Sequence, residues 1–374
     1  MADLRPSVRL RPDVADMPAY VPVEPPEFWV ERLGVPAGRL IKLDANENPY
    51  GPSPRARQAL ADLPNAQIYP DPSQRALRAA LARHLGLDAG RILVGHGSDE
   101  LIDLLLRLVL EAGDVVLDCP PTFGMYRFCT AVCGGRIRPV WRRPDFALDL
   151  PAVEAAAADR RVKAVFITSP NNPDGSITVP AAVERLLRLP ILVVVDEAYV
   201  EFSGSPSLVS QPLREAENLV ILRTFSKWAG LAGLRVGYGH FPAEIIGHLW
   251  KIKPPYNVNV AATAAALASL EDVDYLQANV ARLVAGCERL QAELARFPFL
   301  HPYPSRANFV LCRVSKLPAR QVWEALRRLG VLVRYFEQPG LEDCVRISAG
   351  TPAQVDALLA ALRQIAEEHL GATG

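Results

Sequence analysis

Short, continuous runs of apolar residues alternate with longer amphipathic stretches through the middle of the chain. The runs are rich in Val and Ile and do not alternate with polar residues, which is typical of strands buried on both faces. They lie at 91–95, 114–118, 164–168, 191–196, 219–223 and 234–238, with a weaker run at 137–141. Helices are predicted between them at 99–111, 150–159 and 180–189. This order predicts an α/β fold in which a mostly parallel seven-stranded sheet lies between two layers of helices.

The two ends of the chain have a different pattern. Two long helices, at 258–270 and 273–297, are predicted to follow the sheet. Shorter elements come after them and indicate an α+β unit, with strands at 309–314, 331–335 and 345–348 and helices at 319–329 and 352–369. The start of the chain is proline-rich and irregular, so we expect an arm or lid that packs with this unit. The expected division is an arm over 1–44, a large ligand-binding domain over 45–270 and a small domain over 271–374.

Composition narrows the functional classes. The chain has 41 Lys and Arg and 41 Asp and Glu residues, so its formal net charge is zero. This balance argues against nucleic-acid or anionic-membrane partners, which require an excess of cations. The six cysteines form no CxxC pair and predict reduced thiols. Because there is neither a long apolar window nor a signal-like apolar stretch, we expect a cytoplasmic protein.

Polar residues that follow the predicted strands are candidate site residues, because ligands of open α/β sheets bind at the carboxyl ends of the strands. Asp196 ends the run at 191–196, and Tyr199 follows it. Lys227 lies between an apolar run and a segment rich in Gly and Ala. Poor solvation there would lower the lysine pKa and make its amine a nucleophile toward carbonyl groups.

Two further segments could bind a phosphate and an aromatic ligand. Gly97, Ser98 and Asp99 begin a predicted helix, where backbone N–H groups bind anions. The 169–175 segment, S-P-N-N-P-D-G, is a rigid loop able to present an Asn amide. Taken singly, these segments could equally be a helix cap and a tight turn. Together with Lys227 and Asp196, they match what a pyridoxal phosphate enzyme requires.

The ordered motifs resemble the fold-type I pyridoxal phosphate aminotransferases. The motifs are S-P-N-N-P-D-G at 169–175, D-E-A-Y at 196–199, T-F-S-K at 224–227 and G-L-A-G-L-R-V-G-Y at 230–238. Within this family the chain is most similar to the histidinol-phosphate aminotransferases, through segments such as L-D-A-N-E-N-P-Y-G at 43–51 and R-I-S-A-G-T at 346–351. The resemblance covers about residues 40 to 370. It implies pyridoxal 5′-phosphate as cofactor, no metal and a homodimer.

The resemblance also implies cofactor-binding roles. Lys227 would bind the cofactor covalently and later move a proton, and Asp196 would pair with the ring nitrogen. Asn171 and Tyr199 would hold the phenolic oxygen. The phosphate would lie among Ser98, Asp99, Thr224, Ser226 and Arg235, with Asp99 ordering the loop. Phe123 would stack on the ring, and Tyr69 would reach the cofactor phosphate of the neighbouring subunit.

The implied reaction is amino transfer from histidinol phosphate to 2-oxoglutarate, giving imidazole-acetol phosphate and glutamate. Arg346 would bind the carboxylate of glutamate and, in the other half-reaction, the substrate phosphate. The other substrate-binding residues would be Arg334, Tyr20, Tyr256 and Asn46. Two alternatives stay open: an aromatic amino-acid aminotransferase, and a decarboxylase or lyase similar to threonine-phosphate decarboxylase. Intact Lys227, Asp196 and Arg346 argue against a third, a non-enzymatic binding module.

Four positions depart from the family pattern. Asp174 stands where Thr is usual, His96 where Asn is common and Phe123 where Tyr is commoner, and Trp228 follows the lysine in place of a smaller or different residue. Asp174 places an additional carboxylate near the expected site.

Overall fold

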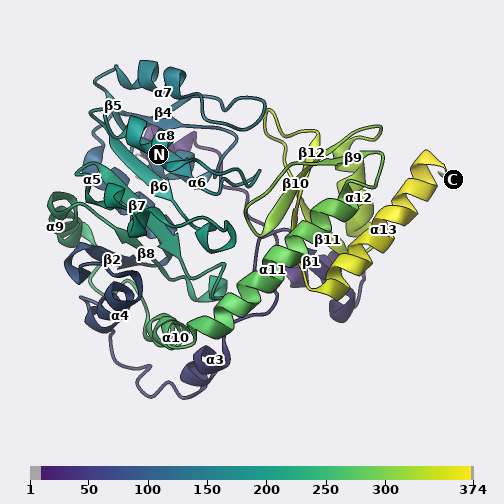
Figure 1. Ribbon diagram of the computed structural model, residues 1–374, viewed down its shortest axis with the longest axis horizontal. Coiled ribbons are helices and arrows are strands. Elements are labelled where there is room, and N and C mark those ends of the chain that lie inside the picture. The colour runs from purple at the N-terminus through teal and green to yellow at the C-terminus, as the bar shows by residue number, and fades with distance from the viewer. Residues whose placement is uncertain (1–9, 372–374) are drawn as a thin grey trace, which may run out of the picture.

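The computed structural model describes residues 10–371 and is built on a seven-stranded sheet (Figure 1). The strand order is β2–β8–β7–β6–β5–β3–β4. Neighbouring strands are parallel except at β8, which runs antiparallel to both β2 and β7. The strands are β2 (Ile92–Gly95), β3 (Val115–Asp118), β4 (Arg136–Pro139), β5 (Val162–Thr168), β6 (Leu192–Asp196), β7 (Leu219–Thr224) and β8 (Gly237–His240). The prediction of a mostly parallel seven-stranded sheet is confirmed.

Helices cover both faces of this sheet. Along β7, Leu219 and Ile221 pack into one apolar cluster, whereas Val220 and Leu222 pack into another. Both faces of the strand are therefore buried, which explains its continuous apolar run. The first cluster includes α7 (Leu150–Ala157) and α8 (Pro180–Leu186), and the second includes α5 (Gly97–Val109), α6 (Met125–Val132) and α9 (Ala243–Ile252). The three-layer α/β architecture is thus confirmed.

A second sheet of five strands joins the two ends of the chain. Its order is β1–β11–β12–β10–β9. The strands are β1 (Ile41–Leu43), β9 (Leu300–Pro302), β10 (Phe309–Val314), β11 (Val331–Tyr335) and β12 (Cys344–Ser348). β1 is parallel to β11, with Ile41 opposite Val331, so the segment before residue 44 forms part of this smaller sheet.

Long helices connect and cover the two sheets. α11 (Val273–Leu294) runs from α10 (Val260–Leu270), beside the large sheet, to the smaller sheet (Figure 1). α12 (Ala319–Arg328) and α13 (Pro352–Leu370) pack on the smaller sheet. We propose that the large and small domains divide near residue 270, at the start of α11.

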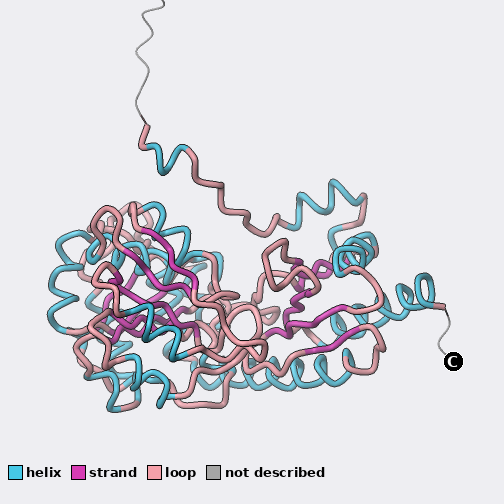
Figure 2. Tube along the Cα trace, turned by 90° about the horizontal axis from the view of Figure 1, so that it is seen from above, coloured by secondary structure: helices cyan, strands magenta, loops and turns pink. Residues whose placement is uncertain are grey.

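The N-terminal segment runs along the outside of both sheets (Figure 2). α1 (Pro12–Ala15) lies against α6, and α2 (Pro26–Leu33) lies near the smaller sheet. Val21 lies in the stretch between α1 and α2, and its carbonyl accepts a hydrogen bond from Nη2 of Arg334 on β11 at 3.4 Å. This contact anchors the segment where it passes from one sheet to the other.

Several local elements differ from the predictions. The strand expected at 234–238 begins only at Gly237, because residues 232–234 form a 3-10 turn and Arg235 adopts a left-handed conformation with φ of 54°. The pattern of apolar residues did not predict α3 (Pro54–Ala61), α4 (Arg75–Leu85), α6, α9, β1 or β9. Within residues 10–371, no helix has the length and apolar character needed to cross a membrane.

Candidate active site

The carboxyl ends of the parallel strands open into a cavity. Strand register places Thr168 opposite Asp196 at this edge, and β8 places Gly237 opposite both Gly95 and Thr224. The loops after β2, β3, β5, β6 and β7 therefore meet in one place. The cavity, here called the inner cavity, is lined by Gly97, Ser98, Asp99, Phe123, Thr168, Asn172, Asp196, Ala198, Tyr199, Thr224, Ser226, Lys227, Ala232 and Arg235.

Lys227 is the amine of the inner cavity. It follows β7 directly after Ser226, and its Nζ donates a hydrogen bond to the carbonyl of Ala45 at 3.1 Å. Desolvation lowers its pKa to about 8, and the nearby Arg346 guanidinium acts in the same direction. A larger fraction of this amine than of an ordinary lysine is therefore uncharged near neutral pH and able to react as a nucleophile.

Asp196 is the acid of the inner cavity and is only 2% exposed. Tyr126 donates a hydrogen bond to its Oδ2 at 2.8 Å, and the Ala198 N–H donates to its Oδ1 at 3.0 Å. Burial raises its pKa to about 6 in spite of these donors. Within the described part of the chain, no Lys, Arg or His forms an ion pair with this carboxylate.

Hydroxyl and guanidinium groups gather beside the first turn of α5. Arg235 forms an ion pair with Asp99, with Nη2 2.8 Å from Oδ2. Thr224 donates to the Ser226 hydroxyl at 2.9 Å, and the Ser226 N–H donates back to Thr224 Oγ1. Ser98 lies in the first turn of α5, where free N–H groups point outward along the helix axis. This arrangement is suited to binding a phosphate.

A second, larger cavity opens from the first. Both are lined by Phe123, Asn172, Tyr199 and Lys227, so they are continuous. This outer cavity reaches the smaller sheet and the N-terminal segment, which contribute the expected substrate-binding residues Tyr20, Asn46, Arg334 and Arg346. Aromatic side chains of the outer cavity include Tyr20, Phe123, Phe128 and Phe336.

Arg346 is the buried cation of the outer cavity. It lies on β12 and is 6% exposed. One Nη donates to the side chain of Asn172, and the other donates to the carbonyl of Asp44 at 2.7 Å. Its Nε has no partner in the described structure. Burial lowers its pKa to about 10, so it remains a cation at neutral pH and offers a donor to an anionic ligand.

Asn46 connects the smaller sheet to the loop after β6. It adopts a left-handed conformation with φ of 55°. Ser348 on β12 donates to its Oδ1 at 3.0 Å, and its Nδ2 donates to the Tyr199 hydroxyl at 3.1 Å. These bonds hold the Tyr199 hydroxyl at the junction of the two cavities.

The structure corrects the placement of the loop asparagine. Asn171 was expected to hold the phenolic oxygen, but its side chain lines neither cavity. Its Nδ2 donates to the Pro121 carbonyl at 3.0 Å and to Asp174, and its Oδ1 accepts from Thr122 at 2.9 Å. The next residue, Asn172, lines both cavities.

The uncommon Asp174 is one of the groups that hold Asn171 inward. Asp174 is 1% exposed, and its Oδ2 accepts a hydrogen bond from the Ser176 N–H at 2.9 Å. It therefore closes the 171–176 turn and fixes Asn171. The S-P-N-N-P-D-G pattern contains two asparagines, and no feature of the pattern distinguishes them.

Two expected site residues lie outside the cavities of their own chain. Tyr69 is 77% exposed and stacks on Tyr256, which is 48% exposed, with ring centroids 4.6 Å apart. Neither lines the inner or the outer cavity. They form an exposed aromatic pair.

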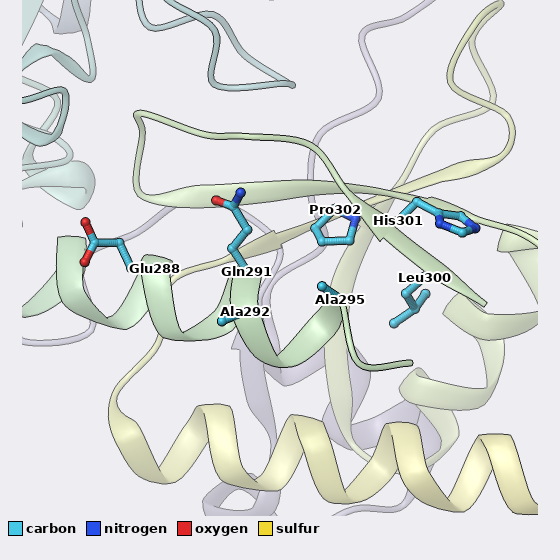
Figure 3. Close-up of a pocket in the computed structure, with 7 residues that line it drawn as sticks. All are labelled: Glu288, Gln291, Ala292, Ala295, Leu300, His301 and Pro302. Atoms are coloured by element: carbon cyan, nitrogen blue, oxygen red, sulfur yellow. The ribbon is translucent and has the colours of Figure 1, made fainter. Parts of the chain in front are cut away.

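A groove between α11 and β9 lacks such a concentration of reactive groups. It is lined by Glu288, Gln291, Ala292, Ala295, Leu300, His301 and Pro302. Its carboxylate and its imidazole lie at opposite ends and do not approach each other (Figure 3). Among residues 10–371, no cluster of three or more His, Cys, Asp or Glu side chains could hold a metal ion. The combined inner and outer cavities are therefore the candidate active site.

Comparisons with known proteins agree with this geometry. The family model for aminotransferase class I and II matches residues 39–362. This chain belongs to the class I and II aminotransferases. It is 53% identical over 365 residues to histidinol-phosphate aminotransferase of Roseiflexus castenholzii, with 96% of this chain and 98% of that protein covered. It is 49% identical to the chloroplastic histidinol-phosphate aminotransferase of Nicotiana tabacum, with 95% and 86% covered.

Two solved structures share the fold. The crystal structure of histidinol-phosphate aminotransferase from Sinorhizobium meliloti, in complex with pyridoxal 5′-phosphate, has a TM-score of 0.88 and 30% identity, with 97% of this chain and 99% of that chain covered. L-threonine-O-3-phosphate decarboxylase from Porphyromonas gingivalis has a TM-score of 0.75 at 23% identity, with 88% and 100% covered. The second likeness shows the fold alone, so the fold does not distinguish amino transfer from decarboxylation.

The close packing of β8 against the start of α5 gives a first prediction. A Cβ on Gly237 would lie 2.5 Å from the backbone nitrogen of Ser98 and 2.8 Å from the carbonyl carbon of Gly97. Gly237→Ala should therefore displace the anion-binding turn and weaken binding of pyridoxal 5′-phosphate by about tenfold or more. Equilibrium titration of the apoprotein measures this change. Gly247→Ala, on α9 with no atom within 4 Å of the added Cβ, is the matched control. Equal affinities of the two variants would contradict the assignment.

Proposed function

We propose that this chain is a pyridoxal phosphate-dependent histidinol-phosphate aminotransferase. The observation that carries the proposal is the placement of Lys227 and Asp196 in one cavity that continues to Arg346. Identity of 53% to a histidinol-phosphate aminotransferase over nearly the whole chain supports the substrate assignment.

The residues of the inner cavity fit pyridoxal phosphate. Asp196 is a buried carboxylate with no cationic partner among the described residues, and a protonated ring nitrogen would supply one. Ser98, Ser226 and Arg235 lie beside the start of α5 and suit a phosphate dianion. Lys227, with its lowered pKa, is the amine that would bind the aldehyde carbon.

Each residue then has a part in the reaction. When bound, pyridoxal phosphate supplies a ring that accepts the electron pair of the substrate α-carbon. Asp196 would hold its negative charge toward the ring nitrogen, and Asn172 and the Tyr199 hydroxyl would hold the phenolic oxygen. Lys227 would accept the α-carbon proton on Nζ and release it again during the transfer. Phe123 covers the ring and excludes water.

The outer cavity suits two different anionic substrates. Arg346 binds the α-carboxylate of glutamate or the phosphate of histidinol phosphate through its guanidinium. Arg334, at the edge of the N-terminal segment, assists with the distal anion. The imidazole ring would then lie along the aromatic side chains of Tyr20 and Phe128.

The same aromatic side chains are also compatible with one competing function. A phenyl ring would fit beside Tyr20 and Phe128 as well as an imidazole, so an aromatic amino-acid aminotransferase is the second candidate. The two differ in their substrate anions, because only histidinol phosphate carries a phosphate and no carboxylate.

A coupled assay of glutamate formation distinguishes these functions. With 2-oxoglutarate as acceptor, we expect kcat/KM for histidinol phosphate to exceed that for phenylalanine by at least about 100-fold. Lys227→Ala should abolish turnover with both donors and serves as the control for contaminating transaminases. A preference for phenylalanine would overturn the substrate assignment, and release of carbon dioxide from phenylalanine in place of glutamate formation would indicate a decarboxylase.

We further propose a homodimer in which Tyr69 reaches the cofactor phosphate of the partner. The support is a set of exposed apolar side chains, Ile68, Tyr69, Ile252 and Tyr256, of which Tyr69 and Tyr256 stack on each other. Exposed apolar residues of this size are typical of subunit contacts. The stacked pair of Tyr69 and Tyr256 lies outside its own chain's cavities, as a residue that serves the partner's site must.

Hybrid dimers test this sharing of residues. A dimer of one Lys227→Ala subunit and one Tyr69→Ala subunit retains one site with both wild-type residues only if Tyr69 serves the partner. Purified through two different affinity tags, this hybrid should have about half the turnover of the wild-type dimer. Both parental homodimers should be far less active. If Tyr69 served its own subunit, the turnover of the hybrid would not exceed the mean turnover of the two parental homodimers.

We propose the cytoplasm as its compartment. All six cysteines are free thiols, and five of them are buried. Free thiols are typical of a reducing compartment.

A further inference from the structure

Tyr126 is a buried phenol whose role the sequence motifs did not indicate. It lies in the second position of α6 and is fully buried. Its hydroxyl is 2.8 Å from Asp196 Oδ2 and 2.8 Å from the Thr168 hydroxyl. It does not line the inner or the outer cavity, so it contacts Asp196 from the protein interior and not from the cavity.

Aromatic packing fixes the position of this phenol. Its ring stacks on Phe166 with centroids 4.7 Å apart and an interplanar angle of 17°. Phe123, which lines the cavity, packs edge-on against it at 5.6 Å. A ring held on two sides has little freedom to rotate, so its hydroxyl is oriented before any ligand binds.

Hydrogen-bond accounting sets the direction of the bond to Asp196. An ionised carboxylate only accepts, so the Tyr126 hydroxyl must donate its single proton to it. Burial raises the pKa of Tyr126 well above its usual value, so this proton stays on the phenol. The Thr168 hydroxyl is then the donor in its bond to the Tyr126 oxygen, because the Tyr126 proton is already used on Asp196. The donors thus point toward Asp196.

We propose that Tyr126 is a positioning residue for Asp196, orienting the carboxylate and keeping it ionised for the ring nitrogen of the cofactor. The proposal deepens the proposed function, on which it rests, by assigning a support to the acid of the same site. A carboxylate in an apolar setting tends to take up a proton, and a neutral acid would no longer favour a protonated ring nitrogen.

The hydrogen bond from Tyr126 is the main influence that lowers the pKa of the buried Asp196 carboxylate. Desolvation is the largest cause of its raised pKa, and Asp99 at the start of α5 acts in the same direction. The Tyr126 hydrogen bond is the largest cause that lowers the pKa, followed by the Ala198 N–H. The other charged or titratable groups that line the same cavity are Tyr199, Lys227 and Arg235.

Cofactor affinity as a function of pH tests the proposal. The Lys227→Ala protein is the starting point, because it removes the lysine that would bind the cofactor covalently and titrate in the same range. Equilibrium titration gives the Kd of pyridoxal 5′-phosphate for Lys227→Ala alone and with Tyr126→Phe. The cofactor's own groups titrate in both proteins, so the difference between their profiles reports the protein.

Loss of the Tyr126 hydroxyl should raise the pH at which cofactor affinity begins to fall on the acid side of the profile. Without its donor the Asp196 carboxylate takes up a proton at higher pH, and binding that needs the carboxylate is lost as pH falls through that value. We expect the weakening to begin about one pH unit higher with Tyr126→Phe, with similar Kd values at alkaline pH. Tyr238→Phe, which removes the hydroxyl of a buried tyrosine outside the inner cavity, should leave the profile unchanged.

The remaining outcomes distinguish a failure of the role proposed for Tyr126 from a failure of the proposed function. Identical profiles, or an equal loss of affinity at every pH, would overturn the role of Tyr126. If the protein with Lys227 intact bound no pyridoxal phosphate at any pH, the proposed function itself would fail. Should Tyr126→Phe not fold, Thr168→Val removes the donor to the Tyr126 hydroxyl and should shift the profile in the same direction.

Discussion

The burial of Asp196 without a cation is the constraint around which the site is organised. A carboxylate that ends a buried strand is costly unless it is hydrogen-bonded or paired. Two donors in the chain satisfy it in part, yet its pKa remains raised. A cationic ring nitrogen would complete the pairing, so the stability of this region and its affinity for the cofactor depend on the same charge.

The two sheets contribute different parts of the chemistry. The large sheet brings Lys227 and Asp196 to its carboxyl edge, whereas the smaller sheet brings Arg346 from β12. Asn46 and Asn172 connect them, because Asn46 bonds to Ser348 and Tyr199, and Asn172 accepts from Arg346. Substrate anions and the reacting amine are thereby held at a fixed separation, which is the geometric requirement for proton transfer at one carbon atom.

Periodicity and strand-end reasoning predicted most of the central sheet. The apolar runs were unbroken because both faces of each strand are covered, as Leu219 and Val220 show by packing into opposite clusters. The same reasoning placed Lys227 and Asp196 at one edge. It did not predict α6, whose residues 125–132 follow a loop without a clear N-cap, and so it did not single out Tyr126.

Features that depend on side-chain direction could not be predicted from one sequence. Asn171 and Asn172 are adjacent and chemically identical, and the groups that hold Asn171 inward, the Pro121 carbonyl, Thr122 and Asp174, come together only in the folded chain. Arg235 was expected within a strand, but its left-handed conformation turns it toward Asp99. Residues 41–43 are too short to show a periodicity, and their pairing with β11 depends on a partner almost 300 residues away.

The central claim is that Lys227 binds the cofactor beside Asp196. Borohydride reduction of the protein loaded with pyridoxal 5′-phosphate converts the covalent link to a stable secondary amine, which peptide mass mapping locates. The account predicts the phosphopyridoxyl group on the peptide that contains Lys227, at one group per chain. Labelling of another residue, such as Lys253, with Lys227 unmodified would contradict it.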